Sequence, residues 1–218
     1  MLHLYGIVQD LDELPEAAGV DGAPLERRRV NGFELIVSRV GDRAAVSQEA
    51  VLRHADVVEA LMGRGGAVLP AQFGAAFADE AELVGAVTER SSELERGLAR
   101  VRGCVEFGLR VLGASDAGTE TAPASGTDYM EARLAHVKQR QRLAAQVHGP
   151  LARIARSARV FDDRPGSLLE AAYLVPEEAA ARFRLHLLRL ERAHPELNIV
   201  CTGPWPPYSF AAEHEGDA

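Results

Sequence analysis

The pattern of apolar and polar positions predicts several short strands in the first half of the chain. An apolar run over residues 2–8 is long enough for a strand and too short for a helix. Residues 33–40 follow Asn31-Gly32, which is typical of tight hairpin turns, and residues 25–30 supply the other arm. Residues 105–112 alternate with a period of two, which indicates a half-buried strand. We expect this strand to close the first structural unit.

Helical periodicity fills the segments between those strands. Ser47 is a good N-cap residue, and apolar residues then recur at helical spacing up to the glycines that begin at Gly63. A second helix is predicted to begin at Asp79, because Glu82 stands three residues further on, as in a capping box. Its apolar stripe consists of Leu83, Val87, Leu94, Leu98 and Val101. The continuous stripe predicts a single helix.

A stretch of small and polar residues at 114–126 separates the two halves of the chain. It contains no bulky apolar residue, so nothing in it anchors a core. We expect a flexible linker there, between an N-terminal domain at residues 1–113 and a C-terminal domain at residues 127–203. A tail at residues 204–218 follows the second domain.

A long helix is predicted to open the second domain. Asp128 is its cap, and Glu131 follows three residues later. Apolar residues recur along one face at a heptad-like spacing: Met130, Leu134, Val137, Ala144, Val147, Leu151, Ile154 and Ala158. Pro150 has no N–H to donate, so we expect a kink or a break near His148.

The remaining elements complete an α+β order. Residues 159–162 and 168–175 form a plausible hairpin, a third helix begins at Pro176, and residues 197–202 make the final strand. Each half thus combines an antiparallel sheet with packed helices, which is compatible with two ferredoxin-like domains.

The tail opens with three prolines and three aromatic residues between Gly203 and Phe210. Proline fixes φ and lacks a donor, so we expect this segment to run extended. Trp205, Tyr208 and Phe210 are candidate partner-binding residues. The alternative is that they fold back onto the second domain and cover its sheet, which would remove an aggregation-prone surface.

Composition narrows the class of protein. A net charge of −8 argues against general nucleic-acid binding, which needs a basic surface. No run of about 18 apolar residues is present to span a membrane. The N-terminal segment has no basic region before its apolar run, so a secretory signal is not expected and we predict a cytoplasmic protein.

Candidate catalytic and metal-binding residues do not converge. Cys104 and Cys201 lack metal-ligand spacing, and the seven histidines form no HxH or HExxH motif. His54 fits a partly buried, hydrogen-bonded histidine better than a catalytic base, since no partner nucleophile accompanies it. The glycines around Arg64 follow a helix and so suit a turn rather than a phosphate loop. We expect no enzymatic activity, no metal and no cofactor.

Basic residues are frequent on the long helix. They are Arg133, Lys138, Arg140, Arg142, Arg153, Arg156 and Arg159. A solvated helix face explains such a run, and an electrostatic dock for an acidic partner, with Arg140 and Arg153 as its contacts, is the alternative.

Four segments resemble the gas vesicle accessory proteins of the GvpL/GvpF family. They are Leu4-Tyr5-Gly6-Ile7, Val68 to Gly74, Gly126 to Met130, and Gly203 to Phe210. Gln72 stands where the family commonly has Arg. The resemblance extends over nearly the whole chain and implies two modified ferredoxin-like domains. It also implies an assembly factor, a minor component of the vesicle, that binds the hydrophobic shell protein GvpA, limits its aggregation and helps nucleate the shell.

Two other functions remain open. A small ligand-binding or enzymatic module is possible on a ferredoxin-like scaffold, since such folds host many functions. Pro204 and Pro207 alone would also suit a ligand for an SH3-like domain, although that interpretation ignores the other three segments.

Overall fold

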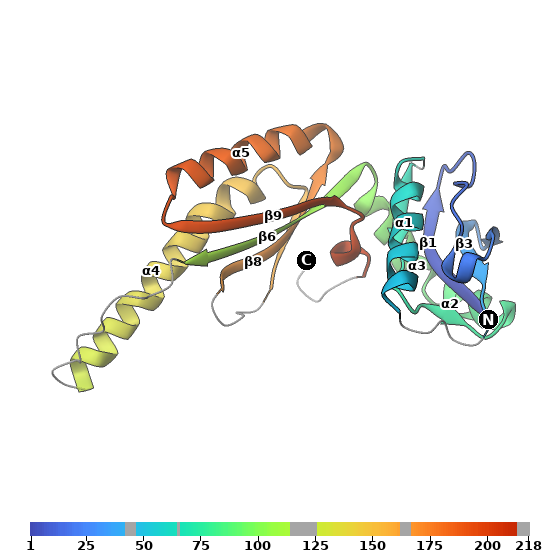
Figure 1. Cartoon of the computed structure of the whole chain (residues 1–218), viewed down its shortest axis with the longest axis horizontal. Coiled ribbons are helices and arrows are strands. Elements are labelled where there is room, and N and C mark those ends of the chain that lie inside the picture. Colours follow the sequence, from blue (N-terminus) through green and yellow to red (C-terminus); the bar gives the residue numbers. More distant parts are fainter. Residues whose placement is uncertain (42–46, 65, 114–125, 162–166, 213–218) are drawn as a thin grey trace. The chain divides into compact units, whose positions relative to one another are not determined.

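The computed structural model describes residues 1–41, 47–64, 66–113, 126–161 and 167–212 (Figure 1). The chain forms two compact units: Met1–Val105 with Trp205–Ala218, and Glu106–Pro204. The chain thus leaves the first unit after Val105 and returns to it at Trp205. All but the last residue of the predicted linker at 114–126 lies outside the described residues.

The first unit contains an antiparallel sheet with the order β2-β3-β1-β4, and β5 also pairs with β1. Its strands are β1 (Leu2–Gln9), β2 (Leu25–Val30), β3 (Phe33–Arg39), β4 (Ala67–Pro70) and β5 (Ala76–Phe77). The predicted hairpin is confirmed, because β2 pairs with β3 from Leu25 opposite Ser38 to Val30 opposite Phe33. Asn31 and Gly32 both have positive φ, as a tight turn between twisted strands requires.

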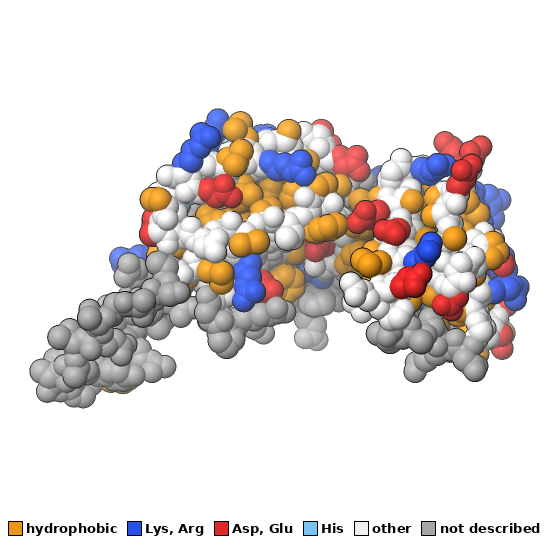
Figure 2. All heavy atoms as spheres, in the orientation of Figure 1, with side chains coloured by type: hydrophobic (Ala, Val, Ile, Leu, Met, Phe, Trp, Pro, Cys, Tyr) orange, Lys and Arg blue, Asp and Glu red, His pale blue; other side chains and the backbone are white. Residues whose placement is uncertain are grey.

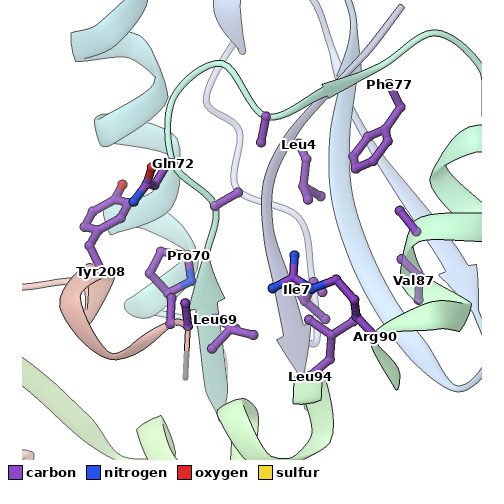
Figure 3. A pocket seen from close by; sticks show the side chains of 15 residues that line it. Leu4, Ile7, Leu69, Pro70, Gln72, Phe77, Val87, Arg90, Leu94 and Tyr208 are labelled. Atoms are coloured by element: carbon purple, nitrogen blue, oxygen red, sulfur yellow. The ribbon is translucent and has the colours of Figure 1, made fainter. Parts of the chain in front are cut away.

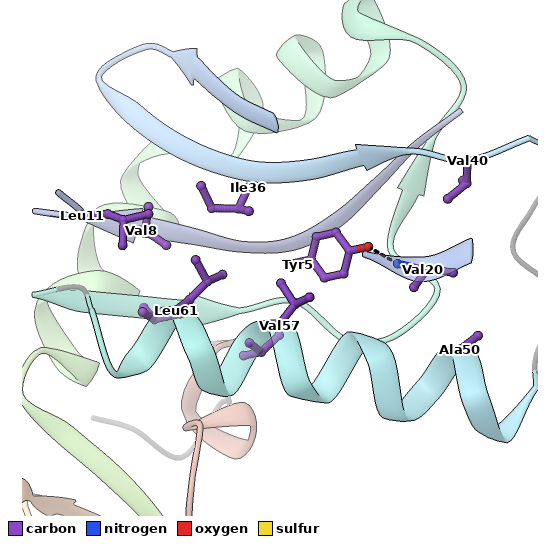
Figure 4. Close-up of a cluster of buried hydrophobic side chains, with 11 residues drawn as sticks. Tyr5, Val8, Leu11, Val20, Ile36, Val40, Ala50, Val57 and Leu61 are labelled. Atoms are coloured by element: carbon purple, nitrogen blue, oxygen red, sulfur yellow. Dashed lines mark hydrogen bonds between the residues drawn. The ribbon is translucent and has the colours of Figure 1, made fainter. Parts of the chain in front are cut away.

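Helix α1 (Gln48–Met62) packs on one face of this sheet. Ser47 accepts a hydrogen bond from the Ala50 amide, so the predicted cap is confirmed. Side chains of α1, β1 and β3 form a buried cluster with the short 3₁₀ turn at Val20–Gly22 (Figure 4). Tyr5, Ile36, Val57, Val58 and Leu61 are fully or almost fully buried there.

The predicted helix from Asp79 to Val101 is two helices. They are α2 (Glu80–Glu89) and α3 (Ser91–Val101), separated by Arg90, whose φ of −106° and ψ of 12° are not helical. The cap at Asp79 is confirmed by its hydrogen bond from the Glu82 amide. The apolar stripe concealed the break, because buried residues on both helices, such as Val87 and Leu94, line the same hollow on the sheet.

The second unit contains a four-stranded sheet with the order β7-β8-β6-β9. The strands are β6 (Cys104–Gly113), β7 (Ser157–Val160), β8 (Ser167–Pro176) and β9 (Leu197–Trp205). The helices are α4 (Gly126–Ala152) and α5 (Ala180–Ala193), and a 3₁₀ turn at Glu177–Ala179 precedes α5. The prediction that residues 105–112 close the first unit is wrong. This strand lies inside the second sheet, where Phe107 stacks on Phe183 of α5 with ring centroids 4.9 Å apart.

Helix α4 passes through Pro150 and ends at Ala152. Of the two predicted outcomes near His148, a break is therefore wrong, and a kink stays a prediction. Val147 and Leu151, on either side of the proline, are both fully buried. The ring nitrogen Nδ1 of His148 lies 3.0 Å from the Tyr173 hydroxyl on β8. Tertiary packing therefore holds the last turn in place although one backbone hydrogen bond is missing.

The described residues of the tail, 204–212, do not cover the second sheet, and they are extended only at their start. Strand β9 ends at Trp205, and Tyr208–Phe210 form a 3₁₀ turn. Phe210 is fully buried, and Tyr208 packs against the α1 cluster of the first unit. The turn lies against α3, where an added Cβ at Gly97 would stand 3.5 Å from the Ala211 carbonyl oxygen. Side chains of the first unit, not the second, therefore bury these aromatics.

Candidate partner-binding groove

An apolar groove opens on the first unit, on the sheet side covered by α2 and α3 (Figure 3). Its volume is about 380 Å³. The floor consists of side chains that are almost fully buried: Leu4, Ile7, Leu69, Val87 and Leu94. The rim carries Gln72, Arg90 and Tyr208, which come from three separate parts of the chain.

A bulge in β1 sets which residues of this strand face the groove and which face the core. The register of β1 against β3 shifts between Leu4 and Gly6, so Tyr5 is the extra residue. Tyr5 and Val8 then point to the α1 cluster, whereas Leu4 and Ile7 line the groove. A single strand thus supplies the core on one face and a binding surface on the other.

The wall of the groove is the segment between β4 and β5, which follows β1 without forming a regular strand. The Ala71 amide donates to the Tyr5 carbonyl at 2.9 Å, and the Leu4 amide donates to the Ala75 carbonyl at 2.8 Å. Gly74 has a φ of +92°, a conformation that favours glycine. The sequence motif from Val68 to Gly74 therefore runs from β4 into the wall, and its Val68 and Phe73 pack in the core cluster.

Two buried histidines, His3 on β1 and His54 on α1, hold this wall in place through hydrogen bonds. Nε2 of His54 lies 2.9 Å from the Ala71 carbonyl oxygen, which accepts only, so Nε2 carries the proton. Nδ1 of His54 then accepts a hydrogen bond from Nε2 of His3 at 2.9 Å. Burial, and then the neighbouring His54, lower the pKa of His3 to about 4, and burial also lowers the pKa of His54. Both rings are therefore neutral at pH 7.

Tyr5 anchors the bulge on its other side. Its hydroxyl accepts a hydrogen bond from the Val20 amide at 2.7 Å and lies 2.9 Å from the Ser38 hydroxyl (Figure 4). Burial raises the pKa of Tyr5, so the phenol stays protonated. These bonds and the histidine pair leave the bulge little freedom.

The groove itself is nearly uncharged. Arg90 is the one ionisable side chain besides Tyr208 among its lining residues, and Glu93 accepts two hydrogen bonds from it at 2.8 and 2.9 Å. Hydrogen bonds to Glu93 raise the pKa of Arg90. The arrangement suits a row of apolar side chains better than a polar or ionic ligand.

The structure separates the residues that the sequence proposed as partner contacts. Tyr208 lies on the groove rim, whereas Phe210 is part of the core and Trp205 is 46% exposed at the end of β9. Arg153 is exposed in the turn after α4 and not on the helix as predicted, and the side chain of Arg140 lies outside the described residues. Sequence analysis missed the groove, although the motif from Val68 to Gly74 marked its wall.

Two observations bear on metal binding and on thiol chemistry. The described residues contain no group of three or more His, Cys, Asp or Glu side chains placed to hold a metal ion. Burial raises the pKa of Cys201 to about 11, so its thiol is protonated and a poor nucleophile at pH 7. No helix in the same part of the chain is long and apolar enough to cross a membrane.

Comparison with known proteins identifies the family. The profile of the family described as gas vesicle synthesis protein GvpL/GvpF matches residues 1–212. The chain belongs to the GvpL/GvpF family. Gas vesicle protein F2 of Halobacterium salinarum is 29% identical, over 99% of this chain and 94% of that protein. Gas vesicle protein L of a Streptomyces species is 28% identical, with the same two coverages.

Solved structures of GvpF share the fold of this GvpL/GvpF chain. The crystal structure of GvpF from an Anabaena species has a TM-score of 0.83 and 20% sequence identity, and the match covers 98% of this chain and 97% of the other. GvpF from Microcystis aeruginosa gives 0.79 and 18%, covering 97% and 99%. The mixed α+β architecture with two antiparallel sheets is thus shared along the full length.

Proposed function

We propose that this GvpL/GvpF protein is a cytoplasmic gas vesicle assembly factor that binds the hydrophobic shell protein GvpA. In this role it limits aggregation of GvpA, helps nucleate the shell and stays as a minor vesicle component. Family membership supports the gas vesicle role, and the apolar groove of the first unit supports the binding of an apolar segment.

The groove is the observation that carries the proposal. Soluble proteins rarely leave an apolar hollow of this kind open to water without a binding role. Its floor of Leu4, Ile7 and Leu94 accepts side chains spaced along one face of a helix. Burial of apolar area would supply the affinity, at about 25 cal/mol per Å² before the costs of association.

In this proposal the tail forms a second side of the groove, separate from the wall between β4 and β5. Tyr208, Ala211 and Ala212 line this side, while Phe210 holds the segment in the core. Removal of residues 204–218 would therefore expose the core together with the groove. Substitutions within the groove are the cleaner way to change binding, because they leave Phe210 in place.

Coexpression tests the function. GvpA should be soluble and should copurify with an affinity-tagged form of this chain, and it should aggregate when the chain is omitted. If GvpA is equally soluble and unbound with and without the chain, the assembly function is wrong.

The size of the groove favours a second candidate, a small apolar ligand. A volume of about 380 Å³ is within the range of small-molecule sites. Native mass spectrometry of the purified chain separates the two candidates, because a ligand-binding module would retain a bound compound whereas a GvpA-binding groove would be empty until GvpA is supplied.

A further inference from the structure

Helix α4 has a half that the second unit does not cover. In Figure 1 the N-terminal part of α4 extends beyond the sheet and α5, whereas its C-terminal part lies along them. Among the α4 residues whose side chains the structure describes, only Val147 and Leu151 are buried. Met130 is 64% exposed and Leu134 is 54% exposed. The extending half therefore presents large apolar side chains to solvent.

The apolar residues of this half follow a coiled-coil heptad. Met130, Val137 and Ala144 fall at position d when Leu134 is at position a, and the other two a positions carry the polar residues Thr127 and Gln141. Most of the stability of a helix in a protein comes from packing its apolar face, and a helix surrounded by water has little stability of its own. A second helix packed along this row would bury it.

The flanking positions of the heptad are basic. Position g carries Arg133 and Arg140, and position e carries Lys138 and one acid, Glu131. In a parallel pair of two copies, Arg133 of one copy would face Lys138 of the other. In an antiparallel pair, arginines at g would face each other, while Glu131 would face Lys138 at e. Like charges thus disfavour a parallel pair, an antiparallel pair gains no net attraction, and the basic majority of these flanking residues favours a partner helix with acidic flanks.

The neighbouring segments of the same chain are not candidates to cover the row. Residues 114–125 and 162–166, which adjoin the described parts of the second unit, contain no Leu, Ile, Val, Met or aromatic residue. A cover for Met130 and Leu134 needs apolar side chains of its own. The occupant is therefore sought in another protein.

We propose that residues 126–144 of α4 form a coiled coil with an amphipathic helix of another protein, which carries Glu or Asp at its e and g positions. This surface lies in the second unit and does not depend on the groove of the first. The second unit would then bind a partner of its own through α4.

A pair of designed peptides tests this proposal with the full-length chain. Each peptide has about three heptads with Leu at a and d, and either Glu or Lys at e and g. Fluorescence anisotropy should show binding of the Glu peptide only, weaker at high salt. Leu134→Ser should weaken this binding at least about tenfold. Leu185→Ser, at a site 47% exposed on α5, is the matched control and should leave it unchanged.

A charge-reversal variant tests whether the basic flanks determine which peptide binds. Lys138→Glu combined with Arg140→Glu should abolish binding of the Glu peptide and create binding of the Lys peptide. The melting temperature should change little, because Lys138 and Leu134 are exposed. The proposal is overturned if neither peptide binds, if both bind equally, or if sedimentation shows a dimer of this chain that Leu134→Ser dissociates.

Discussion

Nε2 of His54 donates a hydrogen bond to the Ala71 carbonyl oxygen at 2.9 Å, which fixes α1 to the wall of the groove. The same ring accepts a hydrogen bond from His3 on β1. Three segments that are far apart in sequence therefore meet at one buried pair of imidazoles. The pair can do this only while His54 is neutral, since its Nδ1 must stay free to accept the hydrogen bond from His3.

Acid should destabilise the first unit through this pair. The pKa of His3 in the folded chain, about 4, lies below its ordinary value of about 6.5, so the unfolded chain takes up the proton first as the pH falls. The stabilising effect is complete above about pH 6.5, and about 3 kcal/mol is lost by pH 4. His54 changes stability in the same direction.

Urea unfolding at pH 7.5 and pH 4.5, followed by circular dichroism, measures this loss. His3→Leu should show a shallower pH dependence than the unmodified chain. His186→Gln, at a histidine on α5 of the second unit, should keep the full dependence. Equal pH dependence in His3→Leu and the unmodified chain would show that the buried pair is not the cause.

Gly6 should tolerate no side chain. An added Cβ would lie 2.9 Å from the Leu69 carbonyl oxygen, where β1 pairs with β4. We expect Gly6→Ala to lower the free energy of unfolding by about 1–3 kcal/mol. Gly85→Ala within α2 is the matched control, because nothing lies within 4 Å of its added Cβ. It should raise stability by up to about 1 kcal/mol, and a similar loss in both variants would contradict the account.

The two aromatics that bracket the Pro-rich segment should differ sharply in their contribution to stability. Phe210 is fully buried, so Phe210→Ala should cost about 3–5 kcal/mol. Trp205 is 46% exposed, and Trp205→Ala should cost no more than about 1 kcal/mol. Thermal unfolding of both variants measures the difference. Equal costs would mean that the tail is not part of the first unit.

Local signals in the sequence predicted the hairpin at Asn31-Gly32 and the caps at Ser47 and Asp79, because each depends on residues a few positions apart. Which sheet contains β6 depends on the distant strands that pair with it. Its alternation of apolar and polar residues would be the same in either sheet, so the sequence pattern could not decide. The buried partner of His54 was hidden for a similar reason. His3 and His54 are 51 positions apart, and only the folded sheet brings them together.

The candidate site was predicted less completely than the fold. The motif from Val68 to Gly74 marked the wall, and Tyr208, which the sequence proposed as a partner contact, lines the groove. The groove also needs α2, α3 and the tail that returns to the first unit. These segments are far apart in sequence, so no local pattern predicts that they lie together. Gln72 lies on the rim, where a cation in its place would alter the charge of the groove.

The most direct measurement is the capture of GvpA by two variants of α2. Ala86 is half-buried and lines the groove, whereas Val84 is 38% exposed and is not one of its lining residues. Ala86→Arg places a charged side chain over the apolar floor, and Val84→Arg adds the same charge elsewhere. With both variants folded by circular dichroism, Ala86→Arg should reduce copurified GvpA at least about tenfold and Val84→Arg should not. Equal capture by the two variants would contradict the assignment of the groove as the GvpA-binding surface.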